Sequence, residues 1–200
     1  MSYLTKMEYE IILKESFSVI RGCSGCGRKT HFYNTKKFRV NANGNRLDVW
    51  LIYQCGKCKH TFNLAIYERQ KASSIPRKEY SGFLSNDEQL AEMYGKSMQF
   101  FKKNKADIDL ERINYEFVKL HEGPEDNDFI GQTVLEIHNP HELKIRPEKQ
   151  IAEALGLSRS QIQKMLQREE IKLEHVSPQS ISVRVSAHGP EREDIGRKQA

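Results

Sequence analysis

The sequence contains 200 residues, of which 38% are hydrophobic and 30% are charged, and its formal net charge is +5. Its mean hydropathy is -0.70, and no apolar run approaches the roughly 18 residues that a membrane helix requires. The first residues also lack the apolar run and the cleavage site of a secretory signal. We therefore expect a cytoplasmic protein with no membrane partner, in a reducing compartment that disfavours structural disulfides.

Residues 1–75 are predicted to form an antiparallel β domain. Two runs rich in strand-forming residues, 36–40 and 47–54, flank the pair Asn43-Gly44. An Asn-Gly pair between two such runs favours a tight hairpin, because it accepts the positive φ angles of the turn. A further run of the same kind covers residues 61–69. Together these runs predict a small sheet.

A helical segment is predicted over residues 82–123, after a polar connection that contains Ser, Pro and Gly. The stretch 85–105 repeats apolar residues at helical spacing, and we expect these to share a face toward the core: Leu90, Met93, Tyr94, Met98 and Phe101. Ser85 or Asn86 is the expected N-cap of this helix. A second helix is predicted over residues 109–121.

Residues 129–187 are predicted to form a C-terminal helix-pair module, and residues 188–200 a flexible tail with too little apolar content to fold alone. Strands are expected at both ends of the module. Gly156 separates its two helices, and Ser158 is the expected N-cap of the second. The expected fold class of the whole chain is therefore α+β.

All four cysteines of the chain lie in two Cys-x-x-Cys pairs, Cys23 with Cys26 and Cys55 with Cys58. Two thiolates at this spacing bind one metal from a single tight turn, and Gly27 after the first pair favours the left-handed backbone of such a knuckle. The hairpin between the pairs returns the chain to the first knuckle. We therefore predict one tetrahedral four-sulfur site in a zinc-ribbon-like domain.

Zinc is the expected metal, at one ion per chain. Its role would be structural, because four protein sulfurs leave no open position for water or substrate. Iron is the alternative, since rubredoxins use two similar knuckles, although the second pair here lacks the proline usual in them. A redox pair of the thioredoxin kind would need one exposed pair at the start of a helix. The nearby His31 and His60 are expected to be polar residues without a ligand role.

Positive charge is concentrated around the cysteines. Between Arg21 and Arg69, ten basic residues stand against two acidic ones, and such a field attracts polyanions. The simpler alternative is that these side chains only keep a small sheet soluble. The basic residues that we expect to face a polyanion here are Lys36, Lys37, Arg39 and Arg46. Phe38 and Trp50 could stack on bases, but burial in the sheet is the favoured interpretation for both.

Several motifs follow one another through residues 20–69: CxxCG, KFRVNAN, LDVWLIY, a second CxxC and a Thr-aromatic-Asn strand. This stretch resembles the signature of a bacterial family catalogued as a domain of unknown function. The resemblance extends more loosely over LSNDEQLAEMYG. It implies a recurrent architecture that carries the metal site, and it assigns no activity.

The segment 146–173 contains the turn LGLSRS between its two helices. It resembles the RNA-binding module of ribosomal small-subunit protein four. The resemblance implies an RNA surface at the matching positions: Arg146, Leu157, Ser158, Arg159, Ser160 and Lys164. Pro147-Glu148 replace the Leu-Asp of that module, and Glu169-Glu170 stand where glycine is usual. The same segment also resembles a helix-turn-helix, which would read DNA. A third interpretation is a helical hairpin that only packs on the rest of the protein.

The sequence contains no Gly-rich phosphate loop, no zinc-protease motif and no evident acid and base pair, so an enzyme is the less favoured interpretation. We expect a zinc-binding protein that binds nucleic acid, with RNA preferred over DNA. One alternative is a DNA-binding regulator. Another is a protein-interaction scaffold whose basic hairpin meets an acidic protein partner.

Overall fold

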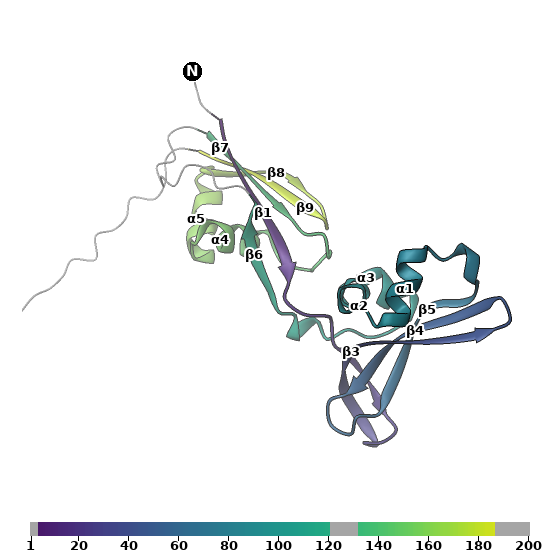
Figure 1. Ribbon diagram of the computed structural model, residues 1–200. Helices are drawn as coiled ribbons and strands as arrows, with labels where there is room; N and C mark the ends of the chain where they lie inside the picture. The colour runs from purple at the N-terminus through teal and green to yellow at the C-terminus, as the bar shows by residue number, and fades with distance from the viewer. Residues whose placement is uncertain (1–3, 121–131, 187–200) are drawn as a thin grey trace, which may run out of the picture. The chain divides into compact units, whose positions relative to one another are not determined.

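The computed structural model describes residues 4–120 and 132–186 (Figure 1). The chain divides into two compact units, and both combine helices with strands, which confirms the α+β class. Residues 13–116 form the first, which we call the cysteine unit. The described residues of 1–12 and 117–200 form the second, which we call the C-terminal unit. The expected flexible tail lies outside the described residues.

The cysteine unit contains a four-stranded antiparallel sheet whose strands follow chain order. The strands are β2 (Val19–Cys23), β3 (Arg28–Asn43), β4 (Arg46–Cys55) and β5 (Thr61–Lys71). The predicted hairpin joins β3 to β4, with Asn43 paired to Arg46. Within the Asn-Gly pair, Gly44 has a positive φ of 60° and Asn43 does not. The centre of the turn therefore lies one residue later than predicted.

Side-chain alternation gives this sheet a buried face and an open face. One cross-strand row consists of three buried side chains: Phe38, Leu51 and Leu64. The next row points to the opposite side, because successive side chains of a strand alternate: Arg39, Trp50 and Ala65. The two faces thus carry different chemistry, apolar on one side and basic with aromatic residues on the other.

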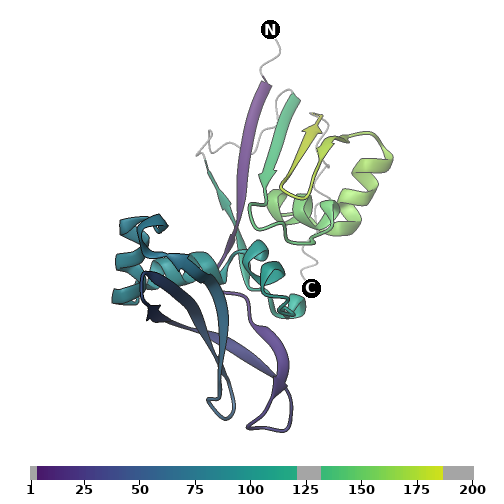
Figure 2. The same cartoon turned by 90° about the vertical axis from the view of Figure 1, so that its right-hand side faces the viewer.

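Three short helices pack on the buried face: α1 (Arg77–Ser85), α2 (Glu88–Gly95) and α3 (Met98–Lys103). Figures 1 and 2 show them gathered on one side of the sheet. The ring of Phe83 in α1 lies 5.0 Å from that of Phe38, and the ring of Phe101 in α3 lies 5.9 Å from that of Tyr53. A 3-10 turn, η1 (Ala72–Ser74), precedes α1. The predicted polar connection therefore includes most of a helix, and Pro76 is tolerated at its start because a helix begins with unpaired N–H groups.

The single helix predicted over residues 85–105 is wrong, because the chain forms α2 and α3 with a break between them. Asp87 caps α2 by accepting from the N–H of Leu90, and Ser97 caps α3. At the end of α2, a Cβ on Gly95 would overlap Ser16 and Asn34, so the helix ends in close contact with its neighbours. The predicted common face is broken as a result, and Met93 is 56% exposed.

The second predicted helix, over residues 109–121, is also wrong. The segment begins with a 3-10 turn, η2 (Leu110–Arg112), and continues as the strand β6 (Tyr115–Lys119). Asp109 is buried at 6% exposure, and its side chain accepts from the N–H of Glu111. The apolar residues of this short stretch fit either a helix or a strand, so the pairing of β6 beside β1 in the sheet decided its structure.

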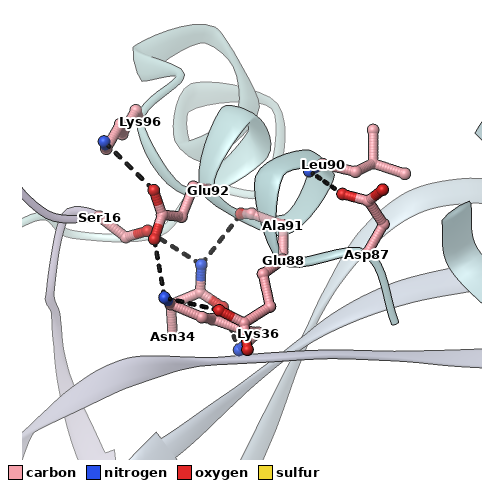
Figure 3. A network of polar contacts seen from close by, with 9 residues as sticks. All are labelled: Ser16, Asn34, Lys36, Asp87, Glu88, Leu90, Ala91, Glu92 and Lys96. Carbon is pink, nitrogen blue, oxygen red and sulfur yellow. Dashed lines mark hydrogen bonds and ion pairs between the residues drawn. The ribbon is translucent and has the colours of Figure 1, made fainter. Parts of the chain in front are cut away.

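A β-bulge in β3 connects the sheet to α2. The pairing register shifts between Asn34 and Lys37, and Lys36 within the bulge has a positive φ of 58°. The Asn34 amide donates to the Ser16 hydroxyl at 2.9 Å and to the Ala91 carbonyl at 3.0 Å (Figure 3). Because a bulge changes the direction of the side chains that it inserts, neighbouring lysines come to point in different directions.

The Lys36 side chain is engaged by two carboxylates of α2. Its ammonium lies 2.8 Å from Glu92 and 3.1 Å from Glu88 (Figure 3). The hydrogen bonds to Glu92 and Glu88 raise the pKa of Lys36. In turn, the hydrogen bond from Lys36 lowers the pKa of Glu92. The positive charge of Lys36 is therefore compensated within the cysteine unit.

The C-terminal unit contains a five-stranded sheet in the order β6-β1-β7-β9-β8. Besides β6, its strands are β1 (Leu4–Leu13), β7 (Gln132–His138), β8 (Ile171–Val176) and β9 (Ser180–Val185). Strand β1 runs parallel to β7, whereas β9 pairs antiparallel with both β7 and β8. The strands predicted at both ends of the C-terminal module are confirmed as β7 and β9.

The predicted helix pair is confirmed as α4 (Pro147–Leu155) and α5 (Arg159–Gln167). Gly156 ends α4 with a left-handed φ of 66°. Ser158 caps α5 in a reciprocal capping box with Gln161, in which each side chain accepts from the backbone N–H of the other. Among the helices that the structure describes, none is long and apolar enough to cross a membrane.

Candidate metal centre and basic surfaces

The first cysteine pair occupies the turn between β2 and β3. Cys23 is the last residue of β2, and its carbonyl accepts from the N–H groups of Cys26 at 3.2 Å and Gly27 at 2.9 Å. Gly27 has the left-handed backbone predicted for it, with a φ of 66°. The turn is therefore a tight knuckle of the kind that holds two thiols toward one point.

The second pair occupies the turn between β4 and β5. The N–H of Cys55 donates to the carbonyl of His60 at 2.8 Å, and the carbonyl of Cys55 accepts from Lys59 at 3.1 Å. Lys59 has a φ of 64° and takes the left-handed position that glycine takes in the first knuckle. Gly56 has a different role, because a Cβ at this residue would lie 2.8 Å from the Tyr33 ring.

The four sulfur atoms form one cluster in which all lie within 4.8 Å of one another. The Sγ of Cys23 lies 3.3 Å from that of Cys58, and the Sγ of Cys26 lies 3.9 Å from that of Cys55. These distances exceed the bond of about 2.05 Å in a disulfide, and all four thiols are free. Around a metal bonded at about 2.3 Å, tetrahedral sulfurs lie about 3.8 Å apart. The cluster can therefore hold one tetrahedral metal ion.

The thiols of the cluster differ in their affinity for protons. The Thr30 hydroxyl donates to the Sγ of Cys55 at 3.2 Å, and this bond lowers the pKa of Cys55 to about 5. Hydrogen bonds to neighbouring thiols raise the pKa of Cys26 to about 12, and the bond with Cys58 contributes most. Like charges at such distances disfavour a second thiolate. A divalent cation reverses this balance, because it binds the deprotonated form and releases the remaining protons.

Two residues besides the four cysteines support the cluster, and neither is predicted from the sequence. Thr30 is 5% exposed and contacts Cys55 from β3. Gly25 leaves space for the second knuckle, because its Cβ would lie 2.9 Å from the Sγ of Cys58. Alternation along β3 could have identified Thr30, since it lies two residues before the buried Phe32 and so on the same face.

The two histidines near the knuckles have partners other than the sulfurs. The Nε2 of His31 lies 2.9 Å from the buried carboxylate of Asp109, and the Nε2 of His60 lies 3.0 Å from the hydroxyl of Ser24. Within the part of the chain that the structure describes, the group that could hold a metal here consists of the four cysteines and does not include either histidine. Both histidines thus make polar contacts; His60 is exposed and His31 is half-buried.

The four basic residues predicted around the hairpin have different surroundings. Lys37 and Arg39 are exposed on the open face of the sheet. Lys36 is engaged by α2, as described above. Arg46 is exposed at the hairpin end of β4, where its guanidinium donates to the carbonyl of Arg69 at 2.9 Å. The freest positive charge of this set therefore belongs to Lys37 and Arg39.

The aromatic residues of β3 and β4 divide between the two faces. Phe38 is buried at 8% exposure, in agreement with the prediction. Trp50 was expected in the core, yet it is half-buried on the open face, opposite Arg39. Tyr33, which the sequence reasoning missed, is 46% exposed. The sequence could have identified Tyr33 through strand alternation, which also places Lys37 and Arg39 on the open face.

The predicted nucleic-acid residues of the C-terminal unit lie around the helix pair, and all of them are exposed: Arg146, Ser158, Arg159, Ser160 and Lys164. Arg146 directly precedes α4, and Ser158 caps α5. The remaining three lie on α5. These residues and the basic residues of the hairpin belong to different units of the chain.

The fold and the sulfur cluster define an α+β protein that can hold one metal ion between two knuckles. The chain belongs to a family described as "Protein of unknown function (DUF1062)", which matches residues 40–177. The match includes the second knuckle and the helix pair. No curated protein and no solved structure gives a significant match.

Proposed function

We propose that Cys23, Cys26, Cys55 and Cys58 bind one structural zinc ion per chain. The observation that carries this proposal is the sulfur cluster, whose distances of 3.3 and 3.9 Å across the two knuckles lie close to those of a tetrahedral site. Zinc and iron both accept four thiolates. Zinc is favoured because it has no redox chemistry and suits a site that only joins two turns.

The Thr30 hydroxyl provides a test of this site. In Thr30→Val, a side chain of the same shape cannot donate to the Sγ of Cys55, and we expect zinc affinity to fall about tenfold. Competition with a chromogenic chelator at pH 7 measures the change. Thr35→Val is the matched control, because it loses a hydrogen bond to the Ile52 carbonyl elsewhere in β3. Equal zinc affinity in the two variants would contradict the role of Thr30.

We further propose that the protein binds RNA through the helix pair α4 and α5. The observation that supports this function is the turn after α5, where Glu169 has a left-handed φ of 59°. Glutamate stands there in place of the glycine usual in the ribosomal RNA-binding module, and the backbone keeps the conformation that favours glycine. Strand β8 then follows, as in that module. The chain before α4 is the strand β7 and a turn, which favours RNA over the helix-turn-helix interpretation.

The charges of α5 give the proposal a direct test. A fluorescently labelled RNA hairpin with an unpaired loop is titrated with the zinc-loaded full chain at about 50 mM salt, where phosphate contacts are strong. In the double variant Arg159→Glu, Lys164→Glu, we expect RNA affinity to fall at least about tenfold. We also expect the number of counterions released on binding, measured from the salt dependence, to fall by about two. The control is Arg77→Glu, Lys78→Glu, which makes the same charge change at exposed positions of α1.

The outcomes separate the competing functions. Failure of the wild-type chain to bind any RNA at this salt concentration would refute the proposal. Tighter binding of duplex DNA than of RNA, with the same dependence on Arg159 and Lys164, would favour the DNA-binding alternative. An equal loss of affinity in the control variant would show that only net charge matters.

A further inference from the structure

The open face of the four-stranded sheet carries a second surface that the helix pair does not explain. We define the open face by three cross-strand rows: Arg39, Trp50 and Ala65; Lys37, Ile52 and Asn63; Tyr33, Gln54 and Thr61. A groove of about 430 Å³ lies over the last two rows and extends to Gly56 and Lys59 of the second knuckle. Helices α1 to α3 pack on the opposite face of this sheet.

We propose that the open face binds unpaired RNA, an inference that rests on the proposed RNA-binding function and adds a site to it. The open face carries exposed positive charge. Lys37 and Arg39 are exposed on neighbouring rows, and Lys59 is exposed at the end of the groove. The Asp48 carboxylate lies one row farther along this face, where it accepts from the N–H of Arg69 at 2.8 Å. Phosphate groups along the face would therefore meet lysine and arginine side chains.

The open face also carries two aromatic rings, those of Tyr33 and Trp50. Tyr33 is 46% exposed, and its ring lies against the backbone of Gly56. Trp50 is half-buried on the same face and is paired to Ala65. Tyr33 is paired to Gln54, four residues from Trp50 along β4, which is about 13 Å of strand. Exposed rings between cations stack the bases of single strands. A paired helix keeps its bases inside, so this arrangement selects unpaired RNA.

The groove also links the RNA site to the metal site. Gly56 and Lys59 belong to the second knuckle, whose Cys55 and Cys58 are metal ligands in the proposed site. The Gln54 side chain donates to the carbonyl of Lys59 at 2.9 Å and fixes that end of the groove. Loss of the metal would therefore remove one wall of the open face.

The fluorescence of Trp50 tests this site directly, because it is the single tryptophan of the chain. The zinc-loaded full chain is titrated with an unlabelled decamer of uridylate, a length of about ten nucleotides that suits a single-strand site. We expect quenching of the Trp50 emission that saturates with the same dissociation constant as the anisotropy of the labelled decamer. The same length of fully paired RNA is expected to cause no quenching.

Charge reversal on the open face provides an independent measurement. The double variant Lys37→Glu, Arg39→Glu is expected to bind the labelled decamer at least about tenfold more weakly than the wild type. The control Arg77→Glu, Lys78→Glu makes the same charge change on α1 and is expected to lose about twofold at most. Both variants change exposed side chains, and equal zinc content and equal thermal unfolding establish that they are folded.

The outcomes distinguish this inference from the function on which it rests. The open-face site alone would be overturned by the following result. RNA leaves the Trp50 emission of the wild type unchanged, the Lys37 and Arg39 variant keeps its affinity, and the wild type still binds RNA through α5. No binding of any RNA would overturn both. Equal binding of polyglutamate, with the same loss in the Lys37 and Arg39 variant, would also overturn it and would identify an acidic polypeptide as the ligand of this face.

Discussion

Chelation of the proposed zinc ion is expected to lower the midpoint of thermal unfolding of the cysteine unit by at least about 15 °C. Metal binding to four thiolates contributes about 10 to 16 kcal/mol in small zinc domains, which is as large as the whole stability of a typical domain. In this unit the metal would join the β2–β3 turn to the β4–β5 turn, since the close sulfur pairs, Cys23 with Cys58 and Cys26 with Cys55, each connect the two.

Calorimetry with and without chelator, under reducing conditions, measures this effect, and metal analysis is expected to give one zinc per chain. Cys55→Ser is expected to reproduce the chelated state, because it removes a buried thiol of the proposed site. Ser24→Ala is the matched control within the first knuckle, since it loses only the exposed contact to His60. A chain that stays fully folded at the same midpoint with reduced thiols and no metal would refute the site.

Truncation of Phe101 is expected to cause the second largest loss, about 3 to 5 kcal/mol in the free energy of unfolding for Phe101→Ala. Phe101 is fully buried. Its ring centroid lies 5.8 Å from that of Phe17, 5.9 Å from that of Tyr53 and 5.4 Å from that of Phe100. Removal of the ring would leave a cavity between α3 and the sheet, and it would also end three edge-on aromatic contacts.

Urea denaturation of the metal-loaded chain, followed by the emission of Trp50, measures this loss in the unit that contains Phe101. Leu84→Ala on α1 is the control, because Leu84 is 58% exposed and its truncation is expected to change stability by no more than about 0.5 kcal/mol. Similar losses in the two variants would contradict the placement of the core between the helices and the sheet.

The cysteine cluster and the helix pair could be predicted because their information is local. A Cys-x-x-Cys pair places both thiols in one turn, and Gly27 accepts the left-handed backbone that the turn requires. In the C-terminal unit, Gly156 and Ser158 end one helix and begin the next through contacts within a few residues. Such signals depend little on the rest of the chain.

The helices of the cysteine unit could not be predicted in the same way. The stretch 85–105 has one helical period, yet Gly95 approaches Ser16 and Asn34 so closely that the helix ends there. The stretch 109–121 contains apolar residues that fit a helix, but β6 pairs within a sheet whose other strands lie far away in the sequence. In both places a contact between distant residues overrode the local preference.

The sequence by itself determined the four cysteines of the candidate metal site, the hairpin, the helix pair and the concentration of basic residues around the cysteines. The tertiary structure decided which of those basic residues can meet a ligand. The bulge in β3 directs Lys36 to the carboxylates of α2 and leaves Lys37 on the open face beside Trp50 and Arg39. The physical reason is that charge and spacing are properties of the chain, whereas the direction of a side chain depends on sheet register and on the helices that cover one face.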